Sequence, residues 1–423
     1  MARPANILNR GEQLCQHLSL GVLSLTFPAQ TITQILRDCD RQSARIRAFP
    51  ALATVYFIMA LGLFMTYGYG EVLRTLTQGL EWLGGRRGKL VTKGAVSIAR
   101  RRLGAEPLRL LHRNHAPPFA SAGSPGAFFK GLLLVVFDGS LFALQDTAAN
   151  AKAFGRPSNQ RGTGAWPMLR FVALLEAGTR AIWAAAIGPY KSSEVTLAGQ
   201  LTDRLEKGML CLADRLFPGY TLWKKARANG CHLLWRAKRA PSLVWVKDLP
   251  DGSWIGRWIS SDRAEKRANP QGLLVRVIEY RLETKQVAGP PLPGAPSATV
   301  YRLFTSILDP AEASAQELAA LYPQRWEIET AFGECKTHLR DHRKVLRSQT
   351  PELVEQEFWG FLLAHYAVRK LAHQAAVQRE EDPDDYSFTH IVRVIRRSVA
   401  GKVPPSPPPP ATGVAGPTAR SNR

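Results

Sequence analysis

The feature that most constrains the fold is a change of pattern near residue 231. From there to residue 305 several segments alternate apolar and polar residues and are rich in Val, Ile, Trp and Tyr, with the turn sequences "PDGS" and "ANPQG" between them. Period-two alternation broken by such turns is typical of β-hairpins. Helical and buried-strand patterns flank this block. The sequence therefore predicts an α/β protein, a mixed sheet flanked by helices, interrupted by an all-β insertion domain over residues 231–305.

The flanking sequence predicts four further segments. Residues 1–110 carry apolar residues at helical spacing and predict an α-helical N-terminal domain that binds DNA, before a Pro/Gly/Ser loop. Residues 115–230 combine apolar strands with short helices, and residues 306–400 are predicted to complete the same α/β domain with helices. The tail 403–423 is Pro-rich and of low complexity, so we expect it to be disordered.

The charge balance narrows the choice of partner. The net charge is +22, from 56 basic and 34 acidic residues. Such an excess suits nucleic acid, although a simple basic protein or a protein at a membrane surface would also show it. The five cysteines are scattered without a CxxC pair, which argues against a zinc site or a disulfide framework. A reducing cytoplasm is the simplest compartment for such a chain.

One apolar run raises the question of a membrane. Residues 51–67 form a run of 17 residues, at the short limit of a spanning helix. The run contains Thr54 and Thr66, and no second run of this kind occurs. We therefore expect a buried helix and no membrane partner. The N-terminus also lacks the apolar core of a signal peptide.

Two aspartates follow apolar strands. Residues 132–137 form a continuous apolar run that ends at Asp138, and Gly139 then predicts a turn before a second strand. Residues 208–213 repeat the pattern, with Asp214 at the end and a helix-prone stretch behind it. Aspartates at strand ends are more often structural than ligands, so this pattern alone assigns them no role.

A third acidic candidate lies in "YPQRWEIETAFGECKTHL", residues 322–339, which we expect to form one amphipathic helix. On a wheel of 100° per residue, four polar side chains share an arc of about 60° that borders the apolar stripe: Tyr322, Arg325, Glu329 and Lys336. Glu329 is then the half-buried glutamate, whereas Glu327 and Glu334 face solvent. An ordinary amphipathic helix with charges at its margin would show the same pattern.

Together these acids suggest a metal site. Carboxylate oxygens are the ligands that Mg²⁺ and Mn²⁺ prefer. Two such ions activate a water or a 3′-hydroxyl and stabilise the leaving oxygen of a phosphodiester. Asp138, Asp214 and Glu329 are therefore candidate ligands for two divalent ions inside a basic, DNA-binding protein.

At this point the sequence resembles a known family. The spacing Tyr322-x2-Arg325-x3-Glu329-x6-Lys336 resembles the Y-R-E-K signature of the DDE transposases of the insertion-element-four group. The segments "FDGSLFALQDTAANAKAFG" and "LCLADRLFPGYTLW" resemble the blocks that carry the family's two catalytic aspartates, with a serine in place of the usual threonine after Asp-Gly. The resemblance covers roughly residues 30–395.

The resemblance implies an RNase H-like catalytic core in which Asp138, Asp214 and Glu329 are both the catalytic residues and the metal ligands. It also implies DNA contacts by four residues that grip phosphates or lie beside the second aspartate: Tyr322, Arg325, Lys336 and Arg215. In relatives an aromatic residue of the insertion stacks on a base that swings out of the duplex. Tyr301 occupies that place here, while Trp254 and Trp258 are alternatives.

The implied function is cut-and-paste DNA transposition of an insertion sequence by metal-dependent strand cleavage, hairpin formation and strand transfer. The expected partners are the terminal inverted repeats of the element, target DNA and a second copy of the chain in a homodimer on DNA. The expected location is the bacterial cytoplasm, in association with the nucleoid. Two alternatives stay open: a catalytically inactive, transposase-derived DNA-binding protein that represses its element, and a structure-directed nuclease on the same fold.

Overall fold

The computed structural model describes residues 21–43, 49–81, 91–159, 162–238, 243–283, 298–339 and 345–400. The Pro-rich tail expected to be disordered lies outside these residues. The chain divides into two compact units. The helical unit comprises Met1–Leu111, Glu334–Arg343 and Glu355–Arg423, and the sheet unit comprises His112–Gly333 and Lys344–Val354. Residues 306–400, which we expected to be one segment of the catalytic core, are thus shared between the two units.

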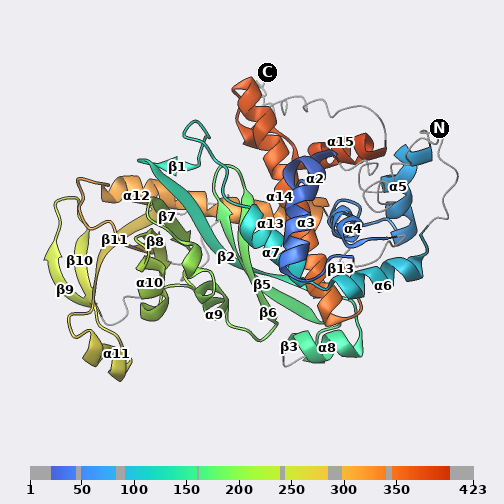
Figure 1. Cartoon of the computed structure of the whole chain (residues 1–423). Coiled ribbons are helices and arrows are strands. Elements are labelled where there is room, and N and C mark those ends of the chain that lie inside the picture. The colour runs from blue at the N-terminus through green and yellow to red at the C-terminus, as the bar shows by residue number, and fades with distance from the viewer. Residues whose placement is uncertain are drawn as a thin grey trace, which may run out of the picture. The chain divides into compact units, whose positions relative to one another are not determined.

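The sheet unit is built on one mixed sheet (Figure 1). Its first five long strands lie in the order β6-β5-β2-β7-β8. Their bounds are Leu132–Leu144 for β2, Met168–Glu176 for β5, Ala181–Pro189 for β6, Met209–Ala213 for β7 and His232–Ala237 for β8. The strands β6, β5 and β2 are antiparallel, while β7 and β8 run parallel to β2. This mixed sheet, flanked by helices, confirms the predicted RNase H-like fold class.

Shorter elements complete this part of the unit. The short strands are Phe128–Phe129 (β1) and Val345–Leu346 (β13), which both pair with β2, and the small hairpin Ser158–Asn159 (β3) and Gly162–Thr163 (β4). The helix Ala148–Phe154 (α8) begins at Thr147, whose hydroxyl accepts a hydrogen bond from the backbone N–H of Asn150.

The strand β2 does not end at Asp138. We predicted a turn there, but β2 continues through Asp138, Gly139 and Ser140, and this prediction is wrong. The antiparallel partner β5 pairs with β2 without interruption, from Val135 opposite Glu176 to Ala143 opposite Met168. Because every residue of that stretch has a partner, the sheet holds the Asp-Gly step extended where a local signal favours a turn.

The strands predicted for residues 231–305 are present, and they extend the same sheet. Beyond β8 follow Ala298–Thr305 (β12), Leu273–Glu283 (β11), Trp254–Trp258 (β10) and Leu243–Asp248 (β9). The link is the antiparallel pairing of β12 with β8, in which Phe304 lies opposite Trp235. The segment also contains a short helix, Arg263–Ala268 (α11). The insertion is therefore continuous with the catalytic sheet and includes a helix.

One face of the sheet carries an aromatic core. The helices Glu194–Gly199 (α9) and Tyr220–Arg227 (α10) pack on this face, next to the 3₁₀ turn Thr202–Arg204 (Figure 1). Trp223 of α10 meets Trp235 of β8 edge to face, with ring centroids 5.2 Å apart, and Trp258 of β10 meets Phe304 in the same manner at 5.7 Å. Because side chains alternate between faces along a strand, the neighbours of these core residues point to the opposite face.

The opposite face is contacted by the segment that carries the signature. This segment comprises Ala315–Leu321 (α12), the 3₁₀ turn Tyr322–Trp326 and Glu327–Gly333 (α13). Helix α12 begins with a capping box, in which Ser314 and Glu317 each accept a hydrogen bond from the other's backbone N–H. The three short helices therefore follow one another directly across the sheet.

A buried arginine fastens this segment to the sheet. Arg276 of β11 is fully buried and forms an ion pair with Asp251, while it also donates to the Ser253 hydroxyl (2.8 Å) and the Ala313 carbonyl (2.7 Å). The Asp251 carboxylate in turn accepts a hydrogen bond of 2.7 Å from the backbone N–H of Ala315, the first residue of α12. A single charge pair thus fixes where α12 begins.

The helical unit is organised around two buried helices. Its elements are Gly21–Thr26 (α2), Ala29–Asp38 (α3), Ala51–Leu63 (α4), Tyr69–Glu81 (α5), Lys93–Leu103 (α6), Phe388–Ala400 (α15) and most of Pro351–Arg379 (α14), while Glu106–His115 (α7) spans the boundary between units. The expected buried helix is α4, with twelve buried residues. Helix α14 is buried on all sides from residue 356 to residue 369. Among the described residues, no helix is long and apolar enough to cross a membrane.

Two glycines let α4 and α14 approach closely. A Cβ atom on Gly360 would lie 3.0 Å from the backbone oxygen of Ile58 and 2.6 Å from its Cγ2. A Cβ atom on Gly62 would lie 2.9 Å from the Cβ of Ala364. Glycine in a helix interior destabilises it by about 1 kcal/mol relative to alanine, so its presence here is explained by packing rather than by propensity.

Replacing the buried arginine tests its role in the sheet unit. We expect Arg276→Ala to lower the free energy of unfolding by about 3–5 kcal/mol, because Asp251 keeps its charge without its partner. The matched control is Arg302→Ala, which breaks the more exposed ion pair with Glu279 in the same sheet and should change stability by less than about 1 kcal/mol. Urea unfolding followed by tryptophan fluorescence measures both, and equal effects would contradict the argument.

The close approach of α4 and α14 makes a second prediction. Gly360→Ala should destabilise the helical unit by about 1–3 kcal/mol, because the added methyl group meets backbone atoms that cannot move aside. Gly94→Ala in the exposed start of α6 should be neutral or stabilising, since its Cβ would meet only the Thr92 hydroxyl at 3.9 Å. Thermal melting by circular dichroism compares the two, and a Gly360→Ala protein as stable as the parent would refute the packing argument.

Candidate active site

The two aspartates lie side by side at one edge of the parallel strands. In the parallel pairing of β2 with β7, Phe137 lies opposite Ala213, and each is followed by its aspartate, Asp138 and Asp214. Phe137 and Ala213 point into the aromatic core, so the aspartates point to the opposite face. The fold therefore brings together two acids that are 76 positions apart in the sequence (214 − 138).

The electrostatics of Asp138 reflect this crowding. Burial raises the pKa of Asp138 to about 6, and the nearby charges of Asp214 and Glu194 act in the same direction. The backbone N–H of Gly139, which donates to Asp138 Oδ1 at 2.7 Å, and the charge of Arg325 act against this rise in pKa. Asp214 is partly buried, and its Oδ1 accepts a hydrogen bond of 2.6 Å from the backbone N–H of Leu216.

Arg325 connects Asp138 to Glu329. Its Nη2 donates to Glu329 Oε1 at 2.9 Å, and its Nη1 lies 3.6 Å from Asp138 Oδ2. The Arg325 side chain is only 9% exposed, whereas that of Glu329 is 43% exposed. The structure thus brings Arg325 and Glu329 of the predicted signature next to the first aspartate.

Tyr322 lies beside the second aspartate. Its hydroxyl donates a hydrogen bond of 3.2 Å to the carbonyl of Ala213, the residue before Asp214. Burial raises the pKa of Tyr322 above its ordinary value, and the charge of Asp214 contributes to this rise while that of Arg325 opposes it. The phenol is therefore a neutral donor fixed at the end of β7.

The stretch 322–339 is not a single α-helix. It is a 3₁₀ turn up to Trp326, then α13, and then a π-helical turn over Glu334–Leu339. A wheel of constant 100° fails across such changes, because 3₁₀, α- and π-helices differ in residues per turn. The prediction of one regular helix is wrong, and so is the ranking that it gave: Glu329, expected to be the half-buried glutamate, is 43% exposed, whereas Glu327 and Glu334 are more buried.

Glu334 was expected to face solvent, and this prediction is wrong. Its side chain is 4% exposed and lies in the helical unit, where it pairs with Arg369 and His365. The hydrogen bond from Arg369 Nε to Glu334 Oε2 is 2.8 Å, and His365 Nε2 lies 3.1 Å from the same oxygen. Glu327 is also partly buried, at 19%, and accepts a hydrogen bond of 2.6 Å from Arg180 Nε.

The remaining signature residue belongs to the other unit. Lys336 lies on the π-helical turn of the helical unit and is exposed. Arg215, which follows the second aspartate, is also exposed. Both side chains can reach a ligand in solvent. The sheet unit by itself brings together Asp138, Asp214 and the residues of the 3₁₀ turn and α13.

Burial distinguishes the three aromatic residues of the insertion that could stack on a base. Trp258 is 4% exposed and packs in the core, and Trp254 packs against the same core. Tyr301 stacks on Tyr280 with ring centroids 5.5 Å apart, on the face opposite that core. Of the three candidates, Tyr301 alone shares a sheet face with the acids.

Two residues near the acids escaped the sequence analysis. Arg236 of β8 follows Trp235, which pairs with Ala213, so Arg236 lies next to Asp214, and its guanidinium lies 4.0 Å from the centre of the Tyr301 ring. Trp326 is 57% exposed, and the Arg325 guanidinium lies 4.9 Å from its ring centre. The signal for Trp326 was its place inside the signature. Arg236 could have been found from the alternation of side chains along the strand that follows Asp214 in the sheet, because its neighbour Trp235 is apolar and buried.

The acids have the chemistry of a divalent-cation site but are not gathered into one. Among the described residues, no group of three His, Cys, Asp or Glu side chains is close enough to hold a metal ion. Asp138 and Asp214 are neighbours, while the Glu329 carboxylate is held by Arg325. Hard carboxylate oxygens fit Mg²⁺ or Mn²⁺, so the side chains present have the donor chemistry of such a site.

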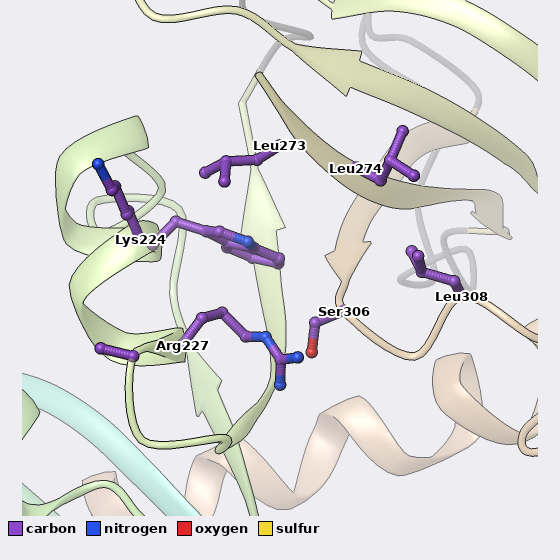
Figure 2. A pocket seen from close by; sticks show the side chains of 8 residues that line it. Lys224, Arg227, Leu273, Leu274, Ser306 and Leu308 are labelled. Atoms are coloured by element: carbon purple, nitrogen blue, oxygen red, sulfur yellow. The ribbon is translucent and has the colours of Figure 1, made fainter. Parts of the chain in front are cut away.

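A separate cavity of about 210 Å³ lies on the other face of the sheet (Figure 2). Trp223 and Leu273 belong to the aromatic core or pack against it, and Lys224, Arg227 and Ser306 also line the cavity. Arg227 already donates to the carbonyl of Cys231. Because the acids point to the opposite face, this cavity is not part of their site.

Gly139 has a packing role beside Asp138. A Cβ atom at this position would lie 2.5 Å from Glu194 Cδ and 2.6 Å from its Oε2. The Glu194 carboxylate is itself held by an ion pair with Arg170 of β5, and Arg170 Nε donates to the Tyr190 carbonyl at 2.9 Å. The Asp-Gly step thus serves the approach of Glu194 rather than a turn.

This close approach predicts a non-additive pair of mutations. Gly139→Ala should destabilise the sheet unit by about 1–3 kcal/mol, because the methyl group displaces Glu194 from Arg170. In a Glu194→Ala background the same substitution should cost much less, since the obstructing carboxylate is gone. A double-mutant cycle by urea unfolding measures the difference, and additive effects would contradict the steric explanation.

Comparisons with known proteins agree with this geometry. Residues 130–366, more than half of the chain, match the family model described as "Transposase DDE domain", and residues 17–113 match "Insertion element 4 transposase N-terminal". The chain is 29% identical over 372 residues to the transposase InsG of insertion sequence element IS4 of Escherichia coli, covering 87% of this chain and 80% of that protein. It is 28% identical over 209 residues to the putative transposase InsZ of the same organism, covering 49% of this chain and 68% of that protein.

Among solved structures, the chain is similar to a piggyBac transposase in a synaptic complex with hairpin DNA, with a TM-score of 0.45 and 10% identity over 91% of this chain and 80% of that chain. The sequence matches carry the assignment, because they cover both the helical N-terminal region and the segment from the first aspartate to α14. The predicted resemblance is confirmed: the chain belongs to the DDE transposases of the insertion-element-four family.

Proposed function

We propose that this transposase moves its insertion sequence by cut-and-paste, with Asp138, Asp214 and Glu329 as the catalytic carboxylates. The observation that carries the proposal is the register of β2 with β7, which places the two aspartates side by side, together with the Arg325 contacts that tie Glu329 to Asp138. DDE transposases depend on divalent metal, and the carboxylates of these acids are the hard oxygen donors that Mg²⁺ and Mn²⁺ prefer.

The chain's own groups would hold and orient a DNA end. Asp138, Asp214 and Glu329 would bind two Mg²⁺ or Mn²⁺ ions, and bound metal would supply activation of the attacking oxygen and stabilisation of the leaving oxygen. The Tyr322 phenol is neutral, and its single O–H donates to the Ala213 carbonyl, so it would have to leave that carbonyl to donate to a phosphate oxygen. Arg325 would give bidentate contacts to phosphate.

Other positively charged residues would also contact DNA. Arg215 and Lys336 are exposed and would contact phosphates as the signature implies. Arg236 lies between Asp214 and the stacked pair Tyr301 and Tyr280, so it would hold the strand where it leaves the acids. These cations act on any sequence, because phosphate contacts position DNA without reading its bases.

Hairpin formation requires a base to leave the stack, and Tyr301 is the aromatic residue that we assign to receive it. Its ring is partly exposed, lies on the same sheet face as the acids and contacts Tyr280 and Arg236, and the Arg236 guanidinium would have to leave the ring face for a base to stack there. Stacking of a base on an aromatic ring is worth about 1–3 kcal/mol. The DNA partners would be the terminal inverted repeats and the target, held by a homodimer.

The proposal is tested by strand cleavage of a labelled element end with Mg²⁺. Asp138→Ala, Asp214→Ala and Glu329→Ala should each reduce cleavage by at least about a thousandfold, because each removes a ligand of the ions that carry the chemistry, while end binding is kept. The matched control is Asp203→Ala, an exposed carboxylate in an exposed ion pair with Arg113, which should cleave at the parental rate.

The products of the same assay separate the possible functions. Hairpin and strand-transfer products from the parent chain support cut-and-paste transposition. Binding without cleavage would support an inactive repressor of the element, and cleavage without transfer would support a nuclease. Parental cleavage by any of the three alanine variants would remove that residue from the site.

A further inference from the structure

Arg325 occupies a central position among the acids. It contacts two of the three carboxylates, Glu329 at 2.9 Å and Asp138 at 3.6 Å, and its side chain is almost buried. One guanidinium charge therefore neutralises the same oxygens that a divalent cation would bind. A contact between Arg325 and a DNA phosphate does not explain why Asp138 and Glu329 hold the guanidinium in the free protein.

A metal ion and the guanidinium compete for these oxygens. Two cations cannot share the same carboxylates without strong repulsion, because like charges a few ångströms apart repel strongly where water is largely excluded. Metal binding therefore requires Arg325 to give up Asp138 and Glu329. A nearly buried guanidinium that loses its anions is strongly destabilised unless another anion replaces them.

A DNA phosphate is such an anion. Its oxygens match the planar fork of a guanidinium as well as a carboxylate does. The Arg325 guanidinium also lies 4.9 Å from the ring centre of Trp326, a side chain that is 57% exposed.

We propose that Arg325 couples DNA binding to assembly of the metal site. In the free protein Arg325 holds Asp138 and Glu329 and opposes metal binding. A phosphate of the DNA end draws Arg325 away and frees both carboxylates for the cation. The inference rests on the proposed function of the three acids. By linkage, bound metal must strengthen DNA binding by the same factor.

Manganese binding tests the coupling without any turnover. Mn²⁺ is titrated into the full chain and free Mn²⁺ is followed by electron paramagnetic resonance, with and without a duplex copied from the boundary of the element. The duplex ends in a dideoxynucleotide, so that no strand transfer follows, and fluorescence anisotropy shows when it is saturated. We expect DNA to lower the Mn²⁺ dissociation constant of the parent chain by about tenfold, within the usual range of couplings.

The decisive variant is Arg325→Gln. Without DNA it should bind Mn²⁺ about tenfold more tightly than the parent, because the competing charge is gone, and saturating DNA should add no further gain. The matched control is Arg180→Gln, which breaks the ion pair between Arg180 and Glu327 of α13 without touching the three acids. This variant should behave as the parent. Circular dichroism shows whether each variant is folded.

Two outcomes overturn the inference, and they are distinguishable. If Arg325→Gln binds Mn²⁺ with parental affinity in the absence of DNA, and Asp138→Asn abolishes that binding, the metal site stands and the coupling fails. If no folded protein binds Mn²⁺ in a manner that depends on Asp138, with or without DNA, the proposed metal site fails together with the coupling.

Discussion

The parallel pairing of β2 with β7 is the interaction on which the site depends. It sets Phe137 opposite Ala213, turns both into the aromatic core, and so points Asp138 and Asp214 together to the opposite face. A shift of one residue in this register would bury the acids in the core, because side chains alternate between faces. The large aromatic side chains on the other face, such as Trp223 and Trp235, make such a shift costly.

The third acid is positioned by a chain of contacts rather than by a strand. Arg276 and Asp251 fix the start of α12, the capping box continues it, and Tyr322 ties the next turn to the end of β7. Glu329 therefore sits on short helices anchored at both ends to the sheet, and it meets Asp138 through Arg325. Asp138 and Asp214 are held by the paired strands, whereas Glu329 is held through the Arg325 guanidinium.

Apolar patterns in the sequence predicted the β-strands of the insertion and the buried helix α4, because they report which faces are buried, and the family resemblance predicted the RNase H-like fold class. Local patterns failed where partners far along the chain decide the local structure. The antiparallel strand β5 extends β2 through a turn signal at Gly139, and Arg369 with His365 buries Glu334. The adjacency of Asp138 and Asp214, and the cavity beside Trp223, depend on register and packing that no local pattern contains.

The interleaving of the two units along the chain has a consequence for protein synthesis. The N-terminal helices bury α4 against α14, whose Gly360 is translated about three hundred residues after Gly62 (360 − 62 = 298). Until then the apolar surface of α4 lacks its partner, and Glu329 is also made late. A nascent or truncated chain therefore has neither a completed helical unit nor all three acids, and it presents an aggregation-prone surface to chaperones. Release of a nearly complete polypeptide is thus a condition for activity.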